Sequence, residues 1–290
     1  MKIPLRFARL LLLTTVLCLA ASTLSASVAE GDRHWAERAE GRDGASAEAG
    51  PVNAAIAEYR EVLEKDPADL EARWKLLRAL RFKGAYVIGD TEGKKRLFDE
   101  ARKIGEKGIS ILEDELRRRG IRRPDEASPE EVARIAKSIP DAGQLYLWNA
   151  INWGEWAQVY GKLAAVRQGA ADRIRRETTI AYEIDPSIEG AGPGRVLGRL
   201  HNQTPRVPFL TGWASDDDAV KFLRESHRLN PEDKLTMVFL AEAMVEANRS
   251  SRPEAIEILR KVIESPNDPE FAVEHASAQE DAKRLLREWR

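Results

Sequence analysis

Three segments of the chain repeat one helical pattern, and this repeat limits the folds that the chain can adopt. Each segment opens with alanine and an apolar residue and ends at a proline eleven or twelve positions later; the openings are Ala55, Ala219 and Ala255. Apolar residues recur at helical spacing in between, and a proline cannot continue the helix. The small opening residue lets a neighbouring helix approach closely. The pattern therefore predicts helices packed in antiparallel pairs.

The remainder of the chain is also helical in pattern, so the predicted fold class is all-α. No segment alternates between apolar and polar residues as a half-buried strand does. We expect helices at residues 31–41, 53–65, 69–84, 94–118, 129–138, 142–167, 170–184, 193–203, 216–229, 233–248, 253–264 and 275–289. In the last of these, one apolar stripe runs among charged residues, which suits a helix that caps a stack; the stripe consists of Ala278, Ala282, Leu285 and Trp289.

Charge and composition exclude several classes of function. The chain has 46 Lys+Arg and 48 Asp+Glu, a net charge of -2, so we expect no nucleic-acid partner that binds by phosphate neutralisation. One Cys and four scattered His leave no recognisable metal site. No catalytic triad or carboxylate pair can be singled out from the sequence. We therefore expect a protein that is not an enzyme and needs no cofactor.

Residues 1–29 have the features of a secretory signal peptide. Three basic residues precede an apolar run at 10–21, and small residues follow up to Ala29, before the first acidic residue. We expect cleavage after Ala29, with Ala26 as the alternative site. The sequence thus predicts a periplasmic protein.

Cys18 raises the question of a lipid anchor. A lipoprotein signal places the modified cysteine directly after a small residue, whereas Leu17 precedes Cys18. We therefore expect ordinary cleavage and release. No later apolar run reaches the ~20 residues that a membrane span needs, so no transmembrane helix is expected in the mature chain.

The repeated segments resemble helix B of the tetratricopeptide repeat (TPR), and the segments after Pro67 and Pro231 resemble helix A. The resemblance implies a TPR-like α-solenoid of antiparallel helix pairs with degenerate repeats. It would form a single domain over 30–290. Repeats with an insertion would occupy 30–140, and further repeats with a capping helix would occupy 141–290.

The middle of the chain resembles a narrower family. Residues 145–156 hold three of the seven Trp, and the glycine-rich stretch 190–201 is followed by two prolines within 205–208. As a set these motifs are similar to the T component of tripartite ATP-independent periplasmic (TRAP) transporter systems, from about Asp141 to about Val245. The resemblance implies a helical array with a cleft that works beside a periplasmic solute-binding protein.

The tryptophan-rich helix carries the candidate ligand site. Helical spacing groups Trp148, Asn152 and Trp156 on one face, and assigns Trp153 and Tyr160 to the other. Indole rings around an amide suit an apolar cleft with a few oriented polar groups. Packing in an ordinary core explains the same residues equally well. We expect the face with Trp153 to pack between neighbouring helices.

Two further polar residues are candidates for ligand contacts. Asn149 lies on the same helix, and His201 lies at the end of the helix expected at 193–203. Helix capping and solvent exposure also account for His201. Both residues are included in the predicted ligand site, which contains no catalytic and no metal-binding residue.

These observations predict an exported, non-enzymatic TPR-like binding or adaptor protein. The narrower hypothesis is an accessory of the T type in a periplasmic uptake system, which binds a small apolar or amphipathic solute, a solute-binding protein or both. The alternative is a general envelope scaffold that holds protein segments and has no small ligand. Self-association to a homo-oligomer is a further expectation, because stacked arrays have open ends.

Overall fold

The computed structural model describes residues 27–208 and 210–289. Within these ranges the chain forms thirteen α-helices and one 3-10 helix, and no strand beyond an isolated bridge between Asp43 and Ser46. The predicted all-α class is confirmed. The helices are α1 Val28–Ala36, α2 Ala49–Lys65, α3 Leu70–Tyr86, α4 Thr91–Arg118, α5 Pro129–Ala136, α6 Ala142–Tyr160, α7 Lys162–Arg167, α8 Ala170–Ile184, α9 Ile188–Gln203, α10 Asp216–Leu229, α11 Lys234–Ala247, α12 Arg252–Glu264 and α13 Ala272–Glu288, with the 3-10 helix η1 at Arg249–Ser251.

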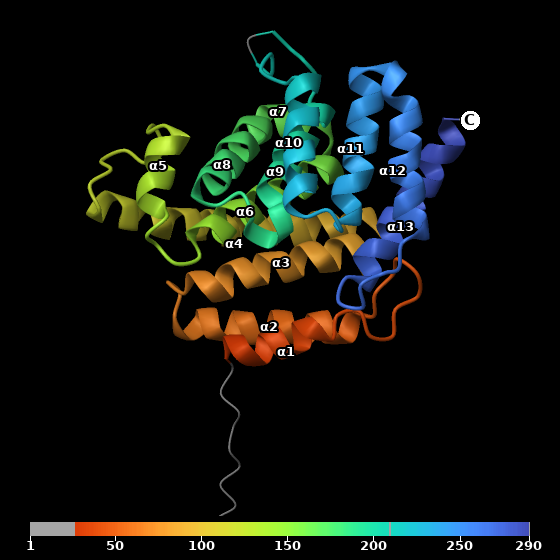
Figure 1. The fold of residues 1–290 in the computed structure, drawn as a ribbon. Helices are drawn as coiled ribbons and strands as arrows, with labels where there is room; N and C mark the ends of the chain where they lie inside the picture. The colour runs from red at the N-terminus through yellow and green to blue at the C-terminus, as the bar shows by residue number, and fades with distance from the viewer. Residues whose placement is uncertain (1–26, 209, 290) are drawn as a thin grey trace, which may run out of the picture.

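The helices lie in two groups that run in different directions. Helices α1 to α4 lie roughly horizontally as stacked layers in Figure 1, and α10, α11 and α12 stand nearly upright above them, with α8 slanted beside α10. Consecutive helices pack against each other in both groups, as α2 does with α3 and α11 with α12. One apolar core fills the N-terminal group and continues into α6 and α8, while smaller clusters lie between α10, α11, α12 and α13.

Helix α6 connects the two groups because it packs against α3, α4, α8 and α9. A helix in contact on several sides must be apolar around most of its circumference, and ten of its nineteen residues are buried. It ends at Gly161, whose φ of 85° lies in the left-handed region that favours glycine. The helix expected at 142–167 is therefore two helices, α6 and the short α7.

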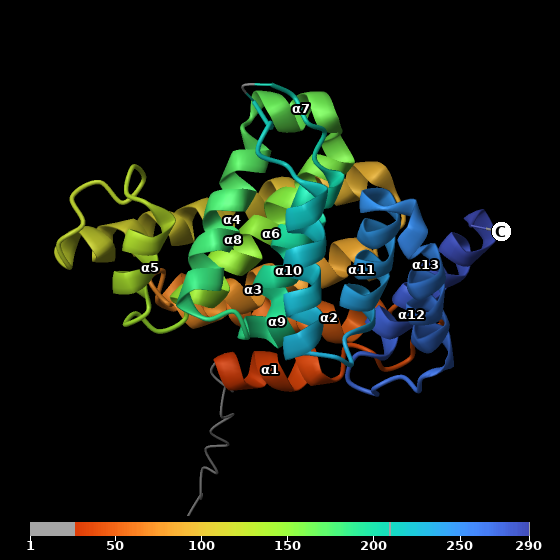
Figure 2. The same ribbon diagram turned by 45° about the horizontal axis from the view of Figure 1, so that its top comes forward.

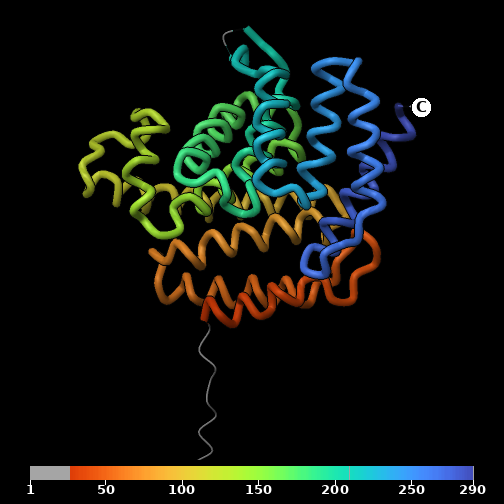
Figure 3. The backbone as a smooth tube through the Cα atoms, in the orientation of Figure 1, coloured from red at the N-terminus to blue at the C-terminus, as the bar shows by residue number. Residues whose placement is uncertain are grey.

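The N-terminal segment contacts the last helix. The loop after α1 lies beside the start of α13, as the tube in Figure 3 shows. Arg38 from this loop is fully buried, and its Nε donates to Oε1 of Glu274 at 3.2 Å. The apolar stripe predicted for the last helix is confirmed at Ala278, Ala282 and Leu285, which are buried against α11 and α12. The start of α13 is thus covered by the N-terminal segment.

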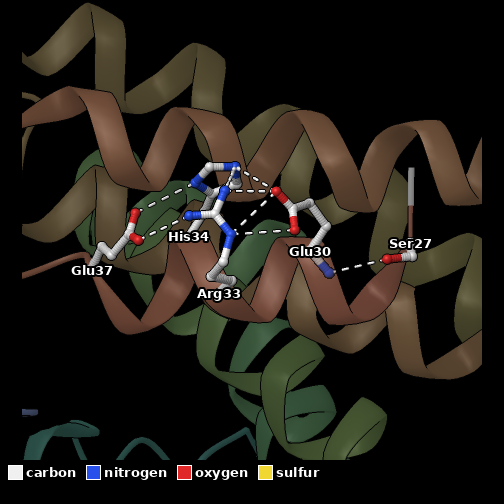
Figure 4. A network of polar contacts seen from close by, with 5 residues as sticks. All are labelled: Ser27, Glu30, Arg33, His34 and Glu37. Carbon is white, nitrogen blue, oxygen red and sulfur yellow. Dashed lines mark hydrogen bonds and ion pairs between the residues drawn. The ribbon is translucent and has the colours of Figure 1, made fainter. Parts of the chain in front are cut away.

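Helix α1 has only nine residues and is stabilised locally. Figure 4 shows the Ser27 Oγ, which accepts a hydrogen bond from the Glu30 N–H at 3.1 Å and so caps the helix. Arg33 bridges Glu30 and Glu37 at 2.6 and 3.0 Å, and His34 lies beside the same two carboxylates. Such pairs support a helix that is too short to be stable alone.

The N-terminal predictions fall largely outside the described residues. Residues 1–26, which include Cys18 and most of the predicted signal peptide, lie outside them. Helix α1 begins at Val28, so cleavage after Ala29 would remove its first two residues and its cap, whereas cleavage after Ala26 would leave the helix whole. No helix in the described part of the chain is long and apolar enough to cross a membrane.

Candidate functional site

The two asparagines predicted to contact a ligand lie in the core. Asn152 is fully buried, and its Nδ2 donates to the carbonyls of Leu77 at 3.1 Å and Trp148 at 2.8 Å. Asn149 is also fully buried and donates to the Glu177 Oε2 at 2.7 Å. The amide oxygens of both asparagines have no hydrogen-bond donor among the described residues. Both side chains join helices to each other, since Leu77 belongs to α3 and Glu177 to α8.

Glu177 is an ionisable group in the same interior region. Burial raises the pKa of its carboxyl to about 8, although Arg173 and the Asn149 amide favour the charged form. The nearest cation, Arg173, lies 3.7 Å away in a loose pair. At neutral pH this carboxyl is therefore mostly protonated.

Trp156 packs into an aromatic group. Its ring stacks on Tyr160 at 4.7 Å and meets Trp153 edge-on at 5.8 Å, so the assignment of Trp156 and Tyr160 to different faces is wrong. These spacings of four and three residues in fact place neighbours on one side of a helix. Asp99 accepts hydrogen bonds from both the Trp156 Nε1 and the Tyr160 hydroxyl. The Arg102 guanidinium stacks against both Trp153 and Trp156.

His201 lies in a separate environment between α9 and α10. Its Nδ1 accepts a hydrogen bond from the Ser215 N–H at 3.2 Å, and its ring packs near Trp213 and Phe222. Burial lowers the pKa of the His201 imidazole, which keeps it neutral at pH 7. Trp148 is linked to the other predicted residues through its backbone carbonyl, which accepts from Asn152, while His201 and Trp156 have other partners. The structure therefore does not gather the five predicted residues into one site.

Trp148 instead joins a group of aromatic and charged side chains from four helices, which we call the Trp–Arg cluster. The cluster brings together α1, α3, α6 and the start of α9, and it consists of Trp35, Trp74, Arg78, Trp148 and Glu189. Figures 1 and 2 show α1, α3 and α9 close together in both views. Its members are only partly buried, except for Trp74, which is 7% exposed.

Arg78 lies at the centre of the Trp–Arg cluster. Its guanidinium carbon is 4.3 Å from the ring centre of Trp35 and 4.8 Å from that of Trp74. Both distances are within the range of cation–π attraction. No carboxylate of the described residues forms an ion pair with Arg78, and its buried Nε has no hydrogen-bond partner. The cation is thus held by indole faces with hydrogen-bonding capacity left over.

Glu189 brings a carboxyl to this cluster from a left-handed turn. The φ values of Glu189, Gly190 and Ala191 are 50°, 62° and 65°, so the helix expected at 193–203 is preceded by three residues in this conformation. The conformation is unfavourable for the two that carry a side chain. Hydrogen bonds hold the turn: Ser226 donates to the Ala191 carbonyl at 2.9 Å.

The Glu189 carboxyl faces cations and one indole. Burial raises its pKa, and Arg78, Arg195 and Lys75 oppose that rise without cancelling it. The Trp148 N–H also favours the charged form of this carboxyl. No hydrogen bond of standard geometry joins the two groups, so the buried Trp148 Nε1 has no hydrogen-bond partner among the described residues. The cluster therefore contains two buried N–H donors without a hydrogen-bond partner among the described residues, the Trp148 Nε1 and the Arg78 Nε.

Ion pairs hold the helices behind the Trp–Arg cluster in place. The Lys75 Nζ lies 2.6 Å from the carboxylates of both Asp32 and Glu71. Asp32 also accepts from the Tyr59 hydroxyl at 2.8 Å, and hydrogen bonding and burial together raise the pKa of that hydroxyl far above its usual value. The Trp74 Nε1 donates to Asp141 at 2.8 Å. These contacts fix α1 and α6 against α3.

Surface hollows lie elsewhere on the described chain. A hollow of about 690 Å³ lies along the second half of α12 and is lined by four charged residues, from Glu257 to Glu264, and by Ser265. Another of about 300 Å³ lies between Phe98, Lys94 and Glu155. Neither is lined by Trp148, Asn152 or Trp156. No group of three His, Cys, Asp or Glu in the described part of the chain could hold a metal ion.

The sequence pattern does not mark Trp35, Trp74, Arg78 or Glu189 as site residues. Trp74 and Arg78 are four residues apart on α3, a spacing that signals neighbours on one helix face. That signal is local, and nothing in it indicates that Trp35 packs on the same guanidinium.

We found no protein-family model that matches the chain and no curated protein that matches its sequence.

Proposed function

We propose that this protein is an exported, non-enzymatic adaptor with a TPR-like α-solenoid fold, which holds a partner protein against the Trp–Arg cluster. The observation that carries the proposal is Arg78, which lies between two indoles and pairs with no carboxylate of the described residues. Trp and Arg are the residue types that dominate binding energy in protein interfaces. A carboxylate of the partner would pair with the guanidinium of Arg78, a residue that is only partly buried.

The solenoid interpretation is supported by the order of packing. Helices α2, α3 and α4 contact one another in sequence order, and α10, α11, α12 and α13 do the same. The repeated openings Ala55, Ala219 and Ala255 are all fully buried, as expected for small residues at helix contacts. In a repeat array each unit contacts mainly its neighbours.

The proposed location and partner rest on the sequence. The basic and apolar pattern of residues 1–29 supports export to the periplasm, and the motifs between Asp141 and Val245 support work beside a solute-binding protein of a TRAP-type system. Another envelope protein would satisfy the same chemistry if it presents a carboxylate next to an apolar surface.

A second candidate function is capture of a small amphipathic solute at the same cluster. The observation that favours it is the buried Trp148 Nε1 without a partner, beside a carboxyl whose pKa is raised. Such donors next to indole faces orient a polar group while an apolar part packs. The burial of Asn149, Asn152 and Trp156 favours the adaptor over this alternative, because these residues are occupied in holding helices together.

Native mass spectrometry on the protein purified from its own cell envelope distinguishes the two. We expect a complex of the protein with one other polypeptide, and we expect the variant Arg78→Gln to lose this complex. The matched control is Arg96→Gln, which changes an exposed arginine on α4 and should retain the complex. Circular dichroism checks that both variants remain folded. A small molecule released on denaturation would favour the second candidate. A complex unaffected by Arg78→Gln would overturn both assignments of the site.

A further inference from the structure

Four of the five large apolar side chains that are most exposed in the described chain come from two neighbouring segments. Leu163 and Val166 of α7 are 66% and 54% exposed, and Val207 and Leu210 of the loop before α10 are 41% and 56% exposed. Figure 2 shows α7 and this loop together at the top of the molecule, and a hydrogen bond from Trp213 to Asp172 brings the loop to the start of α8, which follows α7. We call these four residues, with Lys162, Arg167 and Arg206 beside them, the apolar–basic tip.

The tip is built to present these side chains outwards. Helix α7 has no buried residue, and it contacts the core through the partly buried Ala164 and Ala165. Leu163 and Val166 are three residues apart and so share the opposite side of the helix. The Trp213 Nε1 donates to Asp172 at 3.0 Å, which ties the loop to the start of α8 next to α7.

The charge of the tip has one sign. Residues 156–171 and 190–215 contain no Asp or Glu, although the whole chain has 48 of them. Lys162 and Arg167 are exposed and form no ion pair with any described residue, while Arg206 pairs with Asp216. The carboxylates of Asp172 and Asp216 border the tip, and Asp216 pairs with Arg206, which leaves Lys162 and Arg167 as its unpaired cations. An exposed apolar surface with unpaired cations favours an anionic partner with an apolar interior.

We infer that the apolar–basic tip docks the protein on the surface of a bilayer that contains anionic lipids. Segments that bind at the membrane interface combine aliphatic side chains with neighbouring cations. The aliphatic side chains insert at the boundary of the lipid acyl chains, and the cations contact the lipid phosphate groups. A protein partner fits less well because Leu and Val are under-represented among the residues that dominate protein interfaces. The inference does not depend on the function proposed for the Trp–Arg cluster.

Sedimentation with lipid vesicles tests this inference. The chain beginning at Ser27, which holds every described residue, is mixed at low salt with vesicles of phosphatidylcholine alone or with one third phosphatidylglycerol. We expect sedimentation with the anionic vesicles only. The double variant Lys162→Glu with Arg167→Glu should weaken this binding by about tenfold or more. The double variant Leu163→Ser with Val166→Ser should weaken it as well.

The matched control also reverses the charge of two basic residues, but on α12 instead of the apolar–basic tip. Arg252 and Lys261 of α12 are exposed, and neither forms an ion pair with a described residue. The variant Arg252→Glu with Lys261→Glu should bind anionic vesicles like the unchanged chain. Equal loss in this control would mean that only net charge matters and would overturn the inference. Absence of sedimentation with any vesicle, or equal sedimentation with neutral vesicles, would also overturn it.

Discussion

Arg38 and Glu274 are 236 positions apart in the chain, yet the Arg38 Nε lies 3.2 Å from the Glu274 Oε1. The Arg38 side chain is 1% exposed and also stacks on Trp35 at 4.3 Å and on Phe271 at 5.3 Å. A cation buried this deeply needs its partner, because an uncompensated charge in the interior is strongly unfavourable. The pair therefore links the first helix to the last one.

Removal of this link should destabilise the whole chain. We expect Glu274→Ala to lower the free energy of unfolding by about 3 kcal/mol, since it leaves Arg38 buried without a carboxylate. Urea unfolding followed by circular dichroism measures the change. As a control, Arg33→Ala removes an arginine that is 53% exposed and forms ion pairs on α1. The free energy of unfolding should then fall much less. Equal changes in the free energy of unfolding for the two variants would show that the Arg38–Glu274 pair adds no particular stability.

Glu177 should make the stability depend on pH. The pKa of its carboxyl is about 8 in the folded chain against an ordinary value of 4.5, so the folded state binds the proton more tightly. Between these values the unfolded chain ionises first, and the stability must fall as pH rises from about 4.5 to about 8. The full loss would be about 3–5 kcal/mol.

The variant Glu177→Gln tests this pH dependence. We expect its melting temperature to fall less over that window than that of the unchanged chain, and to exceed it at pH 8. Glu183 lies on the same helix and is exposed, so Glu183→Gln should keep the pH dependence of the unchanged chain. A melting temperature of the unchanged chain that rises from pH 5 to pH 8 would contradict the prediction.

Gly105 should not tolerate a side chain. It lies in α4, and a Cβ at this position would overlap the amide oxygen of Asn149. We expect Gly105→Ala to destabilise the protein by about 2 kcal/mol, despite the higher helix propensity of alanine. Gly154 in α6 is the matched position, because a Cβ there meets only Ile174 at 4.0 Å. Gly154→Ala should leave the midpoint of urea unfolding unchanged or raise it.

The mature chain should begin at Ser27. The Ser27 side chain caps α1, and α1 supplies Asp32 and Trp35 to the cluster region. Mass spectrometry of the secreted protein should find this terminus, which follows from cleavage after Ala26. In the mature chain, Ser27→Ala should lower the stability by about 1 kcal/mol through loss of the cap. A terminus at Glu30 would mean that α1 forms without its cap.

The helices were largely predictable because their signals are local. Ser128 and Ser215 directly precede the helices expected at 129–138 and 216–229, and serine is a typical N-cap residue. Both side chains accept a hydrogen bond from a backbone N–H three residues later. The break at Gly161 was missed because the apolar spacing continues across it. What interrupts the helix is the positive φ of that glycine, which the spacing of side chains does not encode.

The candidate site was much less predictable because its members are distant in sequence. The sequence marked Trp148 and Asn152 as a pair with one role, but Asn152 bonds to the carbonyl of Leu77, 75 positions away. The Trp148 indole acts instead on the carboxyl of Glu189, which belongs to another helix, α9. Side-chain periodicity assigns a residue to a helix face, and only the packing of the helices decides what that face meets.

The Arg38–Glu274 pair also sets an order of events during synthesis. Arg38 leaves the ribosome early, whereas the carboxylate that neutralises it is made more than two hundred residues later. The first layer of helices therefore cannot complete its interior until α13 exists. A chain that is terminated before Glu274 would leave a charged, aromatic-lined surface open, and such incomplete products would be the ones that proteases remove.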